Sequence, residues 1–388
     1  MILLIIGLLM FVGLVVIHEF GHFIMARRNG VEVEEFGIGF PPKIWSRRTK
    51  GGWLFSINLL PLGGFVRLKG EHDDANEAGT FGAASLWAKT KIMAAGVFLN
   101  LVTALVLLTG LAWIGMPQII DNQFTVKSDT KIIPAAVVID AVEKGSPAEK
   151  SGLRAGDTLL AIGPAGKEQT LSSPQSLPSA TKQNAGREVN VRYVRDGEER
   201  RVTATLLTEK VVEDSKKTND TKGYLGIVPD AASIAKQRST WSAPLVALGL
   251  TKQFTELTFQ GLGKALAGLG SAIAGTVTGN TPARQDGQKR ASEQVSGPVG
   301  IFYVLREGRF LGFEFILLVI AIISLTLAIM NILPIPALDG GRLWLTLITH
   351  GIGRPLSQEK EELINGLGFL FLMVLIVLIT VVDVKRFF

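Results

Sequence analysis

Residues 1–26 read MILLIIGLLMFVGLVVIHEFGHFIMA, and this stretch decides the class of the fold. Its first 17 residues contain no charged side chain. At a rise of ~1.5 Å per residue, a helix of this length crosses a hydrocarbon core of ~30 Å. A cleaved signal peptide is the alternative, but it would begin with basic residues and its apolar region would be only about 7–15 residues long. We therefore expect a retained transmembrane helix.

Three further apolar stretches follow, at about 92–114, 315–333 and 367–382. Together with the first they predict a polytopic α-helical membrane protein with four transmembrane helices. The chain as a whole is 47% hydrophobic and 19% charged, whereas a soluble domain carries about 25% charged residues. Residues 241–279 are also apolar, but Lys252, Glu256 and Lys264 interrupt them. Because charges are costly at the bilayer centre, we expect an amphipathic helix in the interface there.

The basic residues predict the orientation. No Lys or Arg precedes the first span, whereas the segment that follows it is rich in both. Basic loops stay on the cytoplasmic side. Both termini and the large central loop are therefore expected outside the cytoplasm, and the net charge of +6 reflects orientation, with no nucleic-acid partner. The basic residues of this segment are Arg27, Arg28, Lys43, Arg47, Arg48, Lys50, Arg67, Lys69, Lys89 and Lys91.

The central loop, residues 121–230, is polar enough to fold outside the membrane. Ser146 and Pro147 can start a short helix, and Asp196-Gly197 is a favourable hairpin turn. Strands are expected at 137–139, 159–162, 188–194 and 201–207, which makes a small α+β domain. Residues 145–157, GSPAEKSGLRAGD, resemble a bacterial PDZ domain, a module that binds extended chain ends at a sheet edge. The alternative is a β-rich domain that only packs against the membrane part.

The chemistry centres on His18-Glu-Phe-Gly-His22 in the first span. Residues i and i+4 lie only about 40° apart around a helix, so both imidazoles point to one side and can hold one Zn²⁺. Glu19 can take a proton from a nearby water and return it to a leaving amine. Such residues are costly in an apolar span, which favours a functional role; the alternative is a polar patch satisfied within the helix bundle. The chain has no cysteine, so cysteine-based metal sites are excluded.

A catalytic zinc usually has a third protein ligand. His72 and His350 lie in polar or loop segments, so Asp339 is the better candidate. If residues 241–279 do not span the membrane, the third span runs inward and brings Asp339 to the side of His22.

The residues around Asp339 predict a break in the helix. Pro334 and Pro336 forbid a regular helix, and Gly340-Gly341 permits close approach of the backbone. A broken helix at membrane depth survives only where it lines a cavity or is buried in protein.

Residues 53–67 predict a β-hairpin between the first two spans. Trp53, Phe55, Ile57 and Leu59 alternate with other residues, as in a strand, and Pro61–Gly64 can form its turn. We expect this hairpin to enter the membrane face; the alternative is an interfacial hairpin that only anchors the loop.

These motifs together resemble the site-2 protease family of intramembrane zinc metalloproteases, family M50, and most closely its bacterial RseP branch, with room here for a single PDZ domain. The resemblance implies four parts: an N-terminal membrane core (1–120), an extracytoplasmic PDZ domain (121–230), an interfacial helix with a linker (231–310), and a C-terminal membrane core (311–388). Further segments that carry the resemblance are 36–43, 61–67, 96–100, 296–301 and 354–357.

The resemblance also implies roles for single residues. His18, His22 and Asp339 would bind zinc, and Glu19 would be the catalytic base. The membrane-associated hairpin would be re-entrant and would pair with and unwind a substrate transmembrane segment. The residues expected on the substrate side, or forming the core of the site, are Asn331, Asn100 and Gly64.

The implied function is regulated proteolysis within the bacterial inner membrane. Substrates would be single-span proteins, either anti-sigma factors already cut by an upstream site-1 type protease or remnant signal peptides, with the PDZ domain as a size or end filter. The alternative is a catalytically idle scaffold that binds membrane partners through its PDZ domain, against which the intact His18, Glu19, His22 and Asp339 argue. A serine protease is disfavoured because no Gly-x-Ser-x-Gly occurs.

Overall fold

The chain forms two compact units, which are described separately. The first comprises Met1–Gly110, Pro244–Arg309 and Ile316–Phe388, and the second comprises Leu111–Ala243 and Phe310–Phe315. The computed structural model describes residues 2–387 apart from 72–76, 121, 134, 172–173, 175, 216–220, 231–233, 295–296 and 354–356. His72, Ser296 and the start of the 354–357 segment therefore lie outside the described residues.

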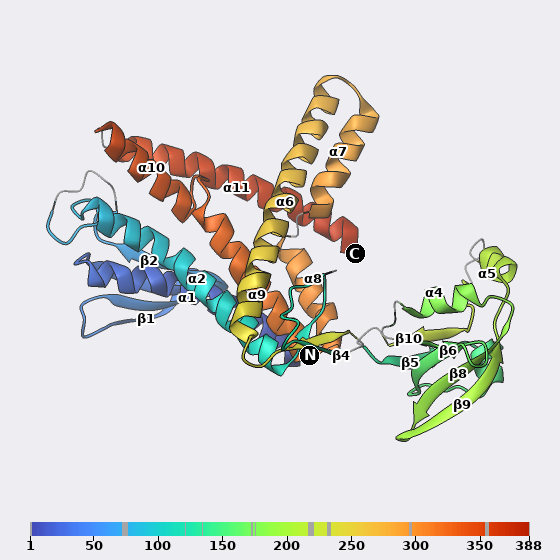
Figure 1. Cartoon of the computed structure of the whole chain (residues 1–388). Helices are drawn as coiled ribbons and strands as arrows, with labels where there is room; N and C mark the ends of the chain where they lie inside the picture. The colour runs from blue at the N-terminus through green and yellow to red at the C-terminus, as the bar shows by residue number, and fades with distance from the viewer. Residues whose placement is uncertain are drawn as a thin grey trace. The chain divides into compact units, whose positions relative to one another are not determined.

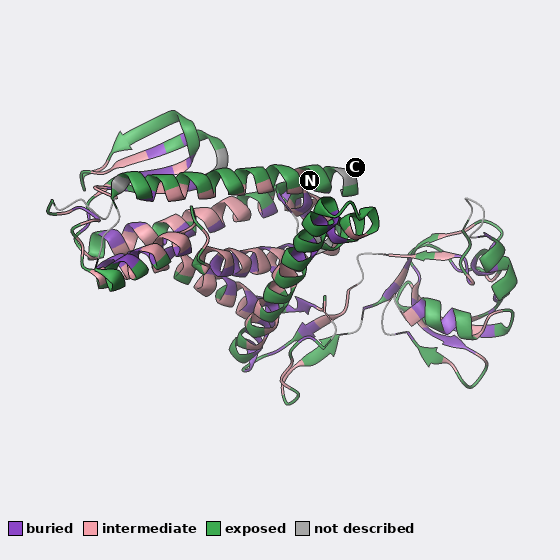
Figure 2. Ribbon diagram, turned by 90° about the horizontal axis from the view of Figure 1, so that it is seen from above, coloured by how far each residue is buried: buried purple, intermediate pink, exposed green. Residues whose placement is uncertain are grey.

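Within the described residues, four helices are long and apolar enough to cross a membrane. They coincide with the four predicted spans, because long uncharged segments can satisfy their backbone in lipid only as helices. The last of them exposes most of its apolar side chains in Figure 2, as a helix facing lipid would. The four are α1 (Ile2–Arg28), α2 (Leu86–Ile114), α9 (Phe313–Ile332) and α11 (Gln358–Phe387).

Residues 241–294 form two helices that pack side by side, α6 (Ala243–Val277) and α7 (Thr281–Gln294) (Figure 1). The polar sequence of 280–294 predicts a linker, and this prediction is wrong, since residues 281–294 form the helix α7. Small residues explain the packing, because a side chain at Gly287 would meet the backbone of Gly268 and Ala272 in α6. α6 is not among the four candidate spans. α7 is followed by α8 (Pro298–Gly308) and the short helix η1 (Arg309–Leu311).

A two-stranded sheet follows α1, made of β1 (Val33–Arg48) and β2 (Leu54–Leu68). The sequence predicts a hairpin whose two strands both lie within 53–67. This prediction is wrong, because these residues pair with β1. Residues 35–38 have two sets of partners, one in 54–57 and one in 64–67, so the first half of β1 lies between the two halves of β2. A series of register shifts along both strands allows this arrangement.

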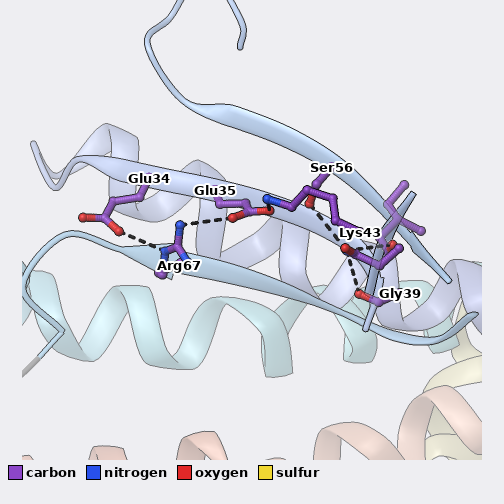
Figure 3. A network of polar contacts seen from close by, with 8 residues as sticks. Glu34, Glu35, Gly39, Lys43, Ser56 and Arg67 are labelled. Carbon is purple, nitrogen blue, oxygen red and sulfur yellow. Dashed lines mark hydrogen bonds and ion pairs between the residues drawn. The ribbon is translucent and has the colours of Figure 1, made fainter. Parts of the chain in front are cut away.

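Ion pairs hold the base of this sheet (Figure 3). Glu35 is buried, with its carboxylate 2.8 Å from Lys43 Nζ and 3.1 Å from Arg67, which also reaches Glu34 at 2.9 Å. At the other end the large side chains of Phe40, Trp45 and others are exposed. The sheet therefore has a charged base and an apolar tip.

The second unit contains two sheets. The smaller is built from β3 (Met116–Pro117), β11 (Lys236–Arg238) and β4 (Lys131–Ile133), in that order. The larger has the order β10-β5-β6-β8-β9, with β7 paired to β6. The strands of this sheet and the helices between them are, in chain order, β5 (Val137–Val142), α3 (Pro147–Lys150), β6 (Thr158–Gly163), β7 (Gln169–Thr170), α4 (Ser176–Gln183), β8 (Glu188–Arg195), β9 (Glu198–Thr205), α5 (Glu209–Ser215) and β10 (Ile227–Pro229).

The predicted local signals of this unit are confirmed. Ser146 Oγ accepts from the Glu149 amide, as an N-cap does, and Pro147 opens α3. Asp196 and Gly197 both have positive φ, 54° and 82°, which is the backbone of a tight hairpin turn between β8 and β9. Alternating side chains of β6 and β8 build the core, with Leu159, Val189 and Val191 fully buried.

One buried ion pair ties this core together. Arg195 contacts both carboxylate oxygens of Asp157 at 2.7 Å, and the Arg154 amide donates to the same carboxylate at 2.7 Å. Burial raises the pKa of Asp157, but the hydrogen bonds from Arg195 and Arg154 lower it more, so it lies below its ordinary value.

Replacing Asp157 with asparagine should destabilise this unit by about 3 kcal/mol, since Arg195 is left without its buried partner. The measurement is the urea midpoint for proteolysis of the unit in the full chain. Glu198→Gln, at an exposed ion pair with Arg200, should cost less than about 1 kcal/mol. The lowered pKa keeps the contribution of Asp157 complete above pH ~4 and removes it as the pH falls further. The difference between wild type and Asp157→Asn should therefore shrink below that pH, and a constant difference would contradict the assignment.

Candidate active site

The two histidines of α1 face the same side of the helix. Their Nε2 atoms lie 3.3 Å apart, as their spacing of four residues requires. α2 passes directly behind them, because Gly21 allows a close approach. A Cβ atom at Gly21 would stand 2.6 Å from the carbonyl oxygen of Ala95. The polar motif is therefore enclosed by the neighbouring helix.

Asp339 meets both histidines. α9 ends at Ile332, the chain bends, and α10 (Asp339–Ile352) begins with this aspartate. Its Oδ2 atom lies 2.8 Å from Nε2 of His18 and 3.2 Å from Nε2 of His22. The bend after α9 therefore brings the Asp339 carboxylate next to both imidazoles.

The bend before Asp339 is tightly packed. Ala337 has a φ of 70°, a conformation that is unfavourable for a residue with a side chain. A Cβ atom at Gly340 or Gly341 would collide with the carbonyl groups of Leu333 or Ile335, so the prediction of close backbone approach is confirmed. Strained backbone of this kind persists where the surrounding structure holds a functional group in place.

The donor set fits a zinc ion. One atom each from His18, His22 and Asp339 can be chosen so that all three lie within 4.8 Å of one another. Nδ1 of His22 is 2.8 Å from the carbonyl oxygen of Ile92, to which it donates, and this leaves Nε2 free to bind a metal. Two imidazoles and a carboxylate are a common ligand set for catalytic zinc. The side chains of the two histidines are only 9% and 12% exposed, and that of Asp339 is 29% exposed.

Glu19 lies against strand β2. The backbone N–H of Val66 donates to its carboxylate. Gly64 leaves room for it, because a Cβ atom there would stand 3.3 Å from Glu19 Cγ. The sheet thus orients the carboxylate beside the histidines, a role of Val66 that its own sequence context does not signal.

Gly96 is a second residue whose role the sequence did not reveal. A Cβ atom at this position would stand 2.5 Å from His22 Nε2 and 2.7 Å from His18 Nε2. α2 can therefore pack on the face of α1 that carries both histidines only with glycine here. The Gly-x-x-x-Asn spacing of 96–100 is the signal that could have indicated it, since it places Gly96 and Asn100 on one face of the helix.

The other predicted site residues differ in whether they contact the histidines. Asn100 is fully buried, with its amide nitrogen 3.1 Å from His18 Nδ1. Asn331 lies in the last turn of α9, and no hydrogen bond joins it to the histidines in the described part of the chain. His350, rejected as a ligand, is exposed in the last turn of α10.

Comparison with known proteins identifies the family. Residues 6–375 match peptidase family M50. The chain is 30% identical to a protein of Clostridium acetobutylicum named as a zinc metalloprotease, over 98% of this chain and 97% of that protein. It is 28% identical to the zinc metalloprotease RasP of Oceanobacillus iheyensis, over 98% of both chains. It is 26% identical to the regulator of sigma-W protease RasP of Bacillus subtilis, over 98% of this chain and 97% of that protein. The chain therefore belongs to peptidase family M50, the site-2 protease family, and is a bacterial membrane zinc metalloprotease.

Proposed function

We propose that His18, His22 and Asp339 hold the zinc and that Glu19 is the catalytic base. The observation that carries the proposal is the approach of Asp339 Oδ2 to both imidazoles, at 2.8 Å and 3.2 Å, from a residue more than 300 positions away in the sequence. Nothing in the packing of an ordinary helix bundle requires a carboxylate at that point.

Bound zinc supplies a Lewis acid that activates water and polarises the scissile carbonyl. Glu19 takes one proton from the attacking water as the water oxygen forms the new C–O bond, and it then delivers that proton to the amine nitrogen as the C–N bond breaks. The Val66 amide donates to this carboxylate and so ties it to β2. Hydrolysis then needs no covalent intermediate with the protein.

The peptide bond that is cut lies inside the membrane. His22 precedes the basic end of α1, Arg27 and Arg28, by about six residues, which is ~9 Å along a helix. The cut therefore falls in a transmembrane segment near its cytoplasmic end. A helical peptide bond is shielded, and the sheet of β1 and β2, with exposed Phe40 and Trp45 at its apolar tip, would unwind the substrate by pairing with it. Asn331 and Gly64 would line the path of the unwound segment.

We further propose that residues 121–230 are an extracytoplasmic PDZ domain that filters substrates by size or free end, with both termini on the same side of the membrane. An antiparallel sheet with the short strand β10 at its edge, paired with β5 alone among the described strands, supports this. Substrates would be single-span proteins already trimmed by a site-1 type protease, such as anti-sigma factors, or remnant signal peptides. A relative named regulator of sigma-W protease supports the first class.

The function is tested by reconstituting the purified chain in liposomes with a trimmed single-span substrate and mapping the products by mass spectrometry. We expect a cut within the apolar span of the substrate, which stops when zinc is chelated and returns when zinc is restored. Cleavage confined to the soluble parts of the substrate would contradict intramembrane proteolysis. No cleavage with zinc bound would favour the scaffold alternative.

A further inference from the structure

Asn100 is a buried polar residue in the apolar helix α2. It is 0% exposed and surrounded by apolar helix. Its side-chain amide lies 3.1 Å from Nδ1 of His18. Its backbone carbonyl accepts a hydrogen bond of 2.8 Å from Ser324 Oγ of α9, which fixes this turn of α2 against the neighbouring helix.

The amide of Asn100 is only half satisfied. Its Oδ1 atom is buried and has no hydrogen-bond partner in the parts of the chain that the structure describes. A buried carbonyl oxygen without a donor is costly. Rotating the amide by 180° exchanges Nδ2 and Oδ1, which have nearly the same shape, and places the oxygen on His18 Nδ1.

Metal binding by His18 requires that rotated form. An imidazole that binds a metal through Nε2 carries its proton on Nδ1, which must then donate to an acceptor. For His22 the acceptor is the carbonyl oxygen of Ile92, 2.8 Å away. For His18 the neighbour of Nδ1 is the Asn100 amide, whose oxygen is free to accept.

We infer that Asn100 is a positioning residue for the metal ligand His18, with its Oδ1 atom accepting a hydrogen bond from His18 Nδ1–H. This inference rests on the proposed zinc site. It replaces the expectation that Asn100 touches substrate, since a fully buried side chain beneath His18 offers substrate no surface. α2 thus supports the zinc site at two positions one turn apart. Gly96 leaves room for the two imidazoles, and Asn100 provides the acceptor for His18.

The test compares three variants of the full chain purified in detergent. Asn100→Leu keeps the branched shape of the side chain and removes the acceptor. Asn100→Asp restores an acceptor for His18 Nδ1–H. Thr103→Val is the matched control, because Thr103 lies one turn further along α2 and its hydroxyl donates to the Leu99 carbonyl of its own helix. The measurements are the zinc dissociation constant by chelator competition and the visible absorption spectrum of the cobalt-substituted protein.

We expect Asn100→Leu to weaken zinc binding about 10–100-fold, as the loss of an outer-shell partner does, and to change the cobalt spectrum. Asn100→Asp and Thr103→Val should both keep wild-type affinity within about threefold, the aspartate because a carboxylate–histidine–zinc arrangement is itself common. Wild-type affinity and an unaltered spectrum in Asn100→Leu would overturn the inference. If Asn100→Leu does not fold, a loss of zinc in Asn100→Asp with Thr103→Val unaffected would overturn it equally.

Failure of the underlying zinc site would look different. In that case His18→Ala would keep full zinc affinity, whereas failure of the inference alone leaves His18→Ala without zinc and Asn100→Leu with it.

Discussion

Glu19→Gln is expected to stop cleavage of a transmembrane substrate while zinc remains bound. Glutamine has nearly the same size and still accepts a hydrogen bond from the Val66 amide. It cannot take a proton from water, and the loss of a general base typically costs about 10²–10⁴-fold in rate. The measurement is the initial rate of cleavage in liposomes together with the zinc content of the same preparation.

Glu34→Gln is the matched control for this variant. Glu34 sits on the exposed side of β1, where it pairs with Arg67 at 2.9 Å, and it should change the rate less than about twofold, since exposed ion pairs contribute little. Cleavage by Glu19→Gln at the wild-type rate would remove Glu19 from the reaction. A parallel loss of zinc would instead make Glu19 part of the metal site.

Gly96→Ala is expected to abolish both zinc binding and cleavage by adding a single methyl group. The new Cβ atom would stand 2.5 Å from His22 Nε2 and 2.7 Å from His18 Nε2, so α1 and α2 must separate or the imidazoles must turn away. Either movement breaks a ligand geometry that tolerates displacements of only about 0.5 Å. Zinc content and far-UV circular dichroism of the purified variant measure the effect.

Gly110→Ala provides the control within the same helix. In the described part of the chain, no atom outside the helix's own backbone and the neighbouring residues lies within 4 Å of a Cβ atom at Gly110, and alanine favours a helix by about 1 kcal/mol over glycine. This variant should keep full zinc and full activity. Full zinc occupancy in Gly96→Ala would contradict the close contact between α2 and the histidines.

The spans and the convergence of the proposed zinc ligands were the predictable part of the molecule. A long uncharged segment has one stable conformation in lipid, and residues four apart on a helix share one side whatever surrounds them. Asp339 could also be predicted, because two prolines and two glycines mark a break in the helix that would be unstable at membrane depth without a function. These signals are local in the sequence.

What the sequence did not predict depends on contacts between distant segments. Residues 53–67 alternate as a strand should, but nothing local indicates that β1 would lie between the two halves of β2, because register shifts set that pairing. Residues 280–294 look like a polar linker, yet residues 281–294 form the helix α7, whose backbone approaches α6 closely at Gly287. The close approach of Gly96 to both histidines was also not predicted, because it depends on how α1 and α2 pack together.

The zinc content of Asp339→Ala tests the central claim most directly. We expect one zinc ion per chain in the wild type and much less than one in the variant, because the two imidazoles alone leave the site with too few protein ligands for stable binding. Asp286→Ala, at an exposed ion pair with Arg290 on α7, should keep the wild-type value. Full zinc occupancy in Asp339→Ala would contradict a site built from His18, His22 and Asp339.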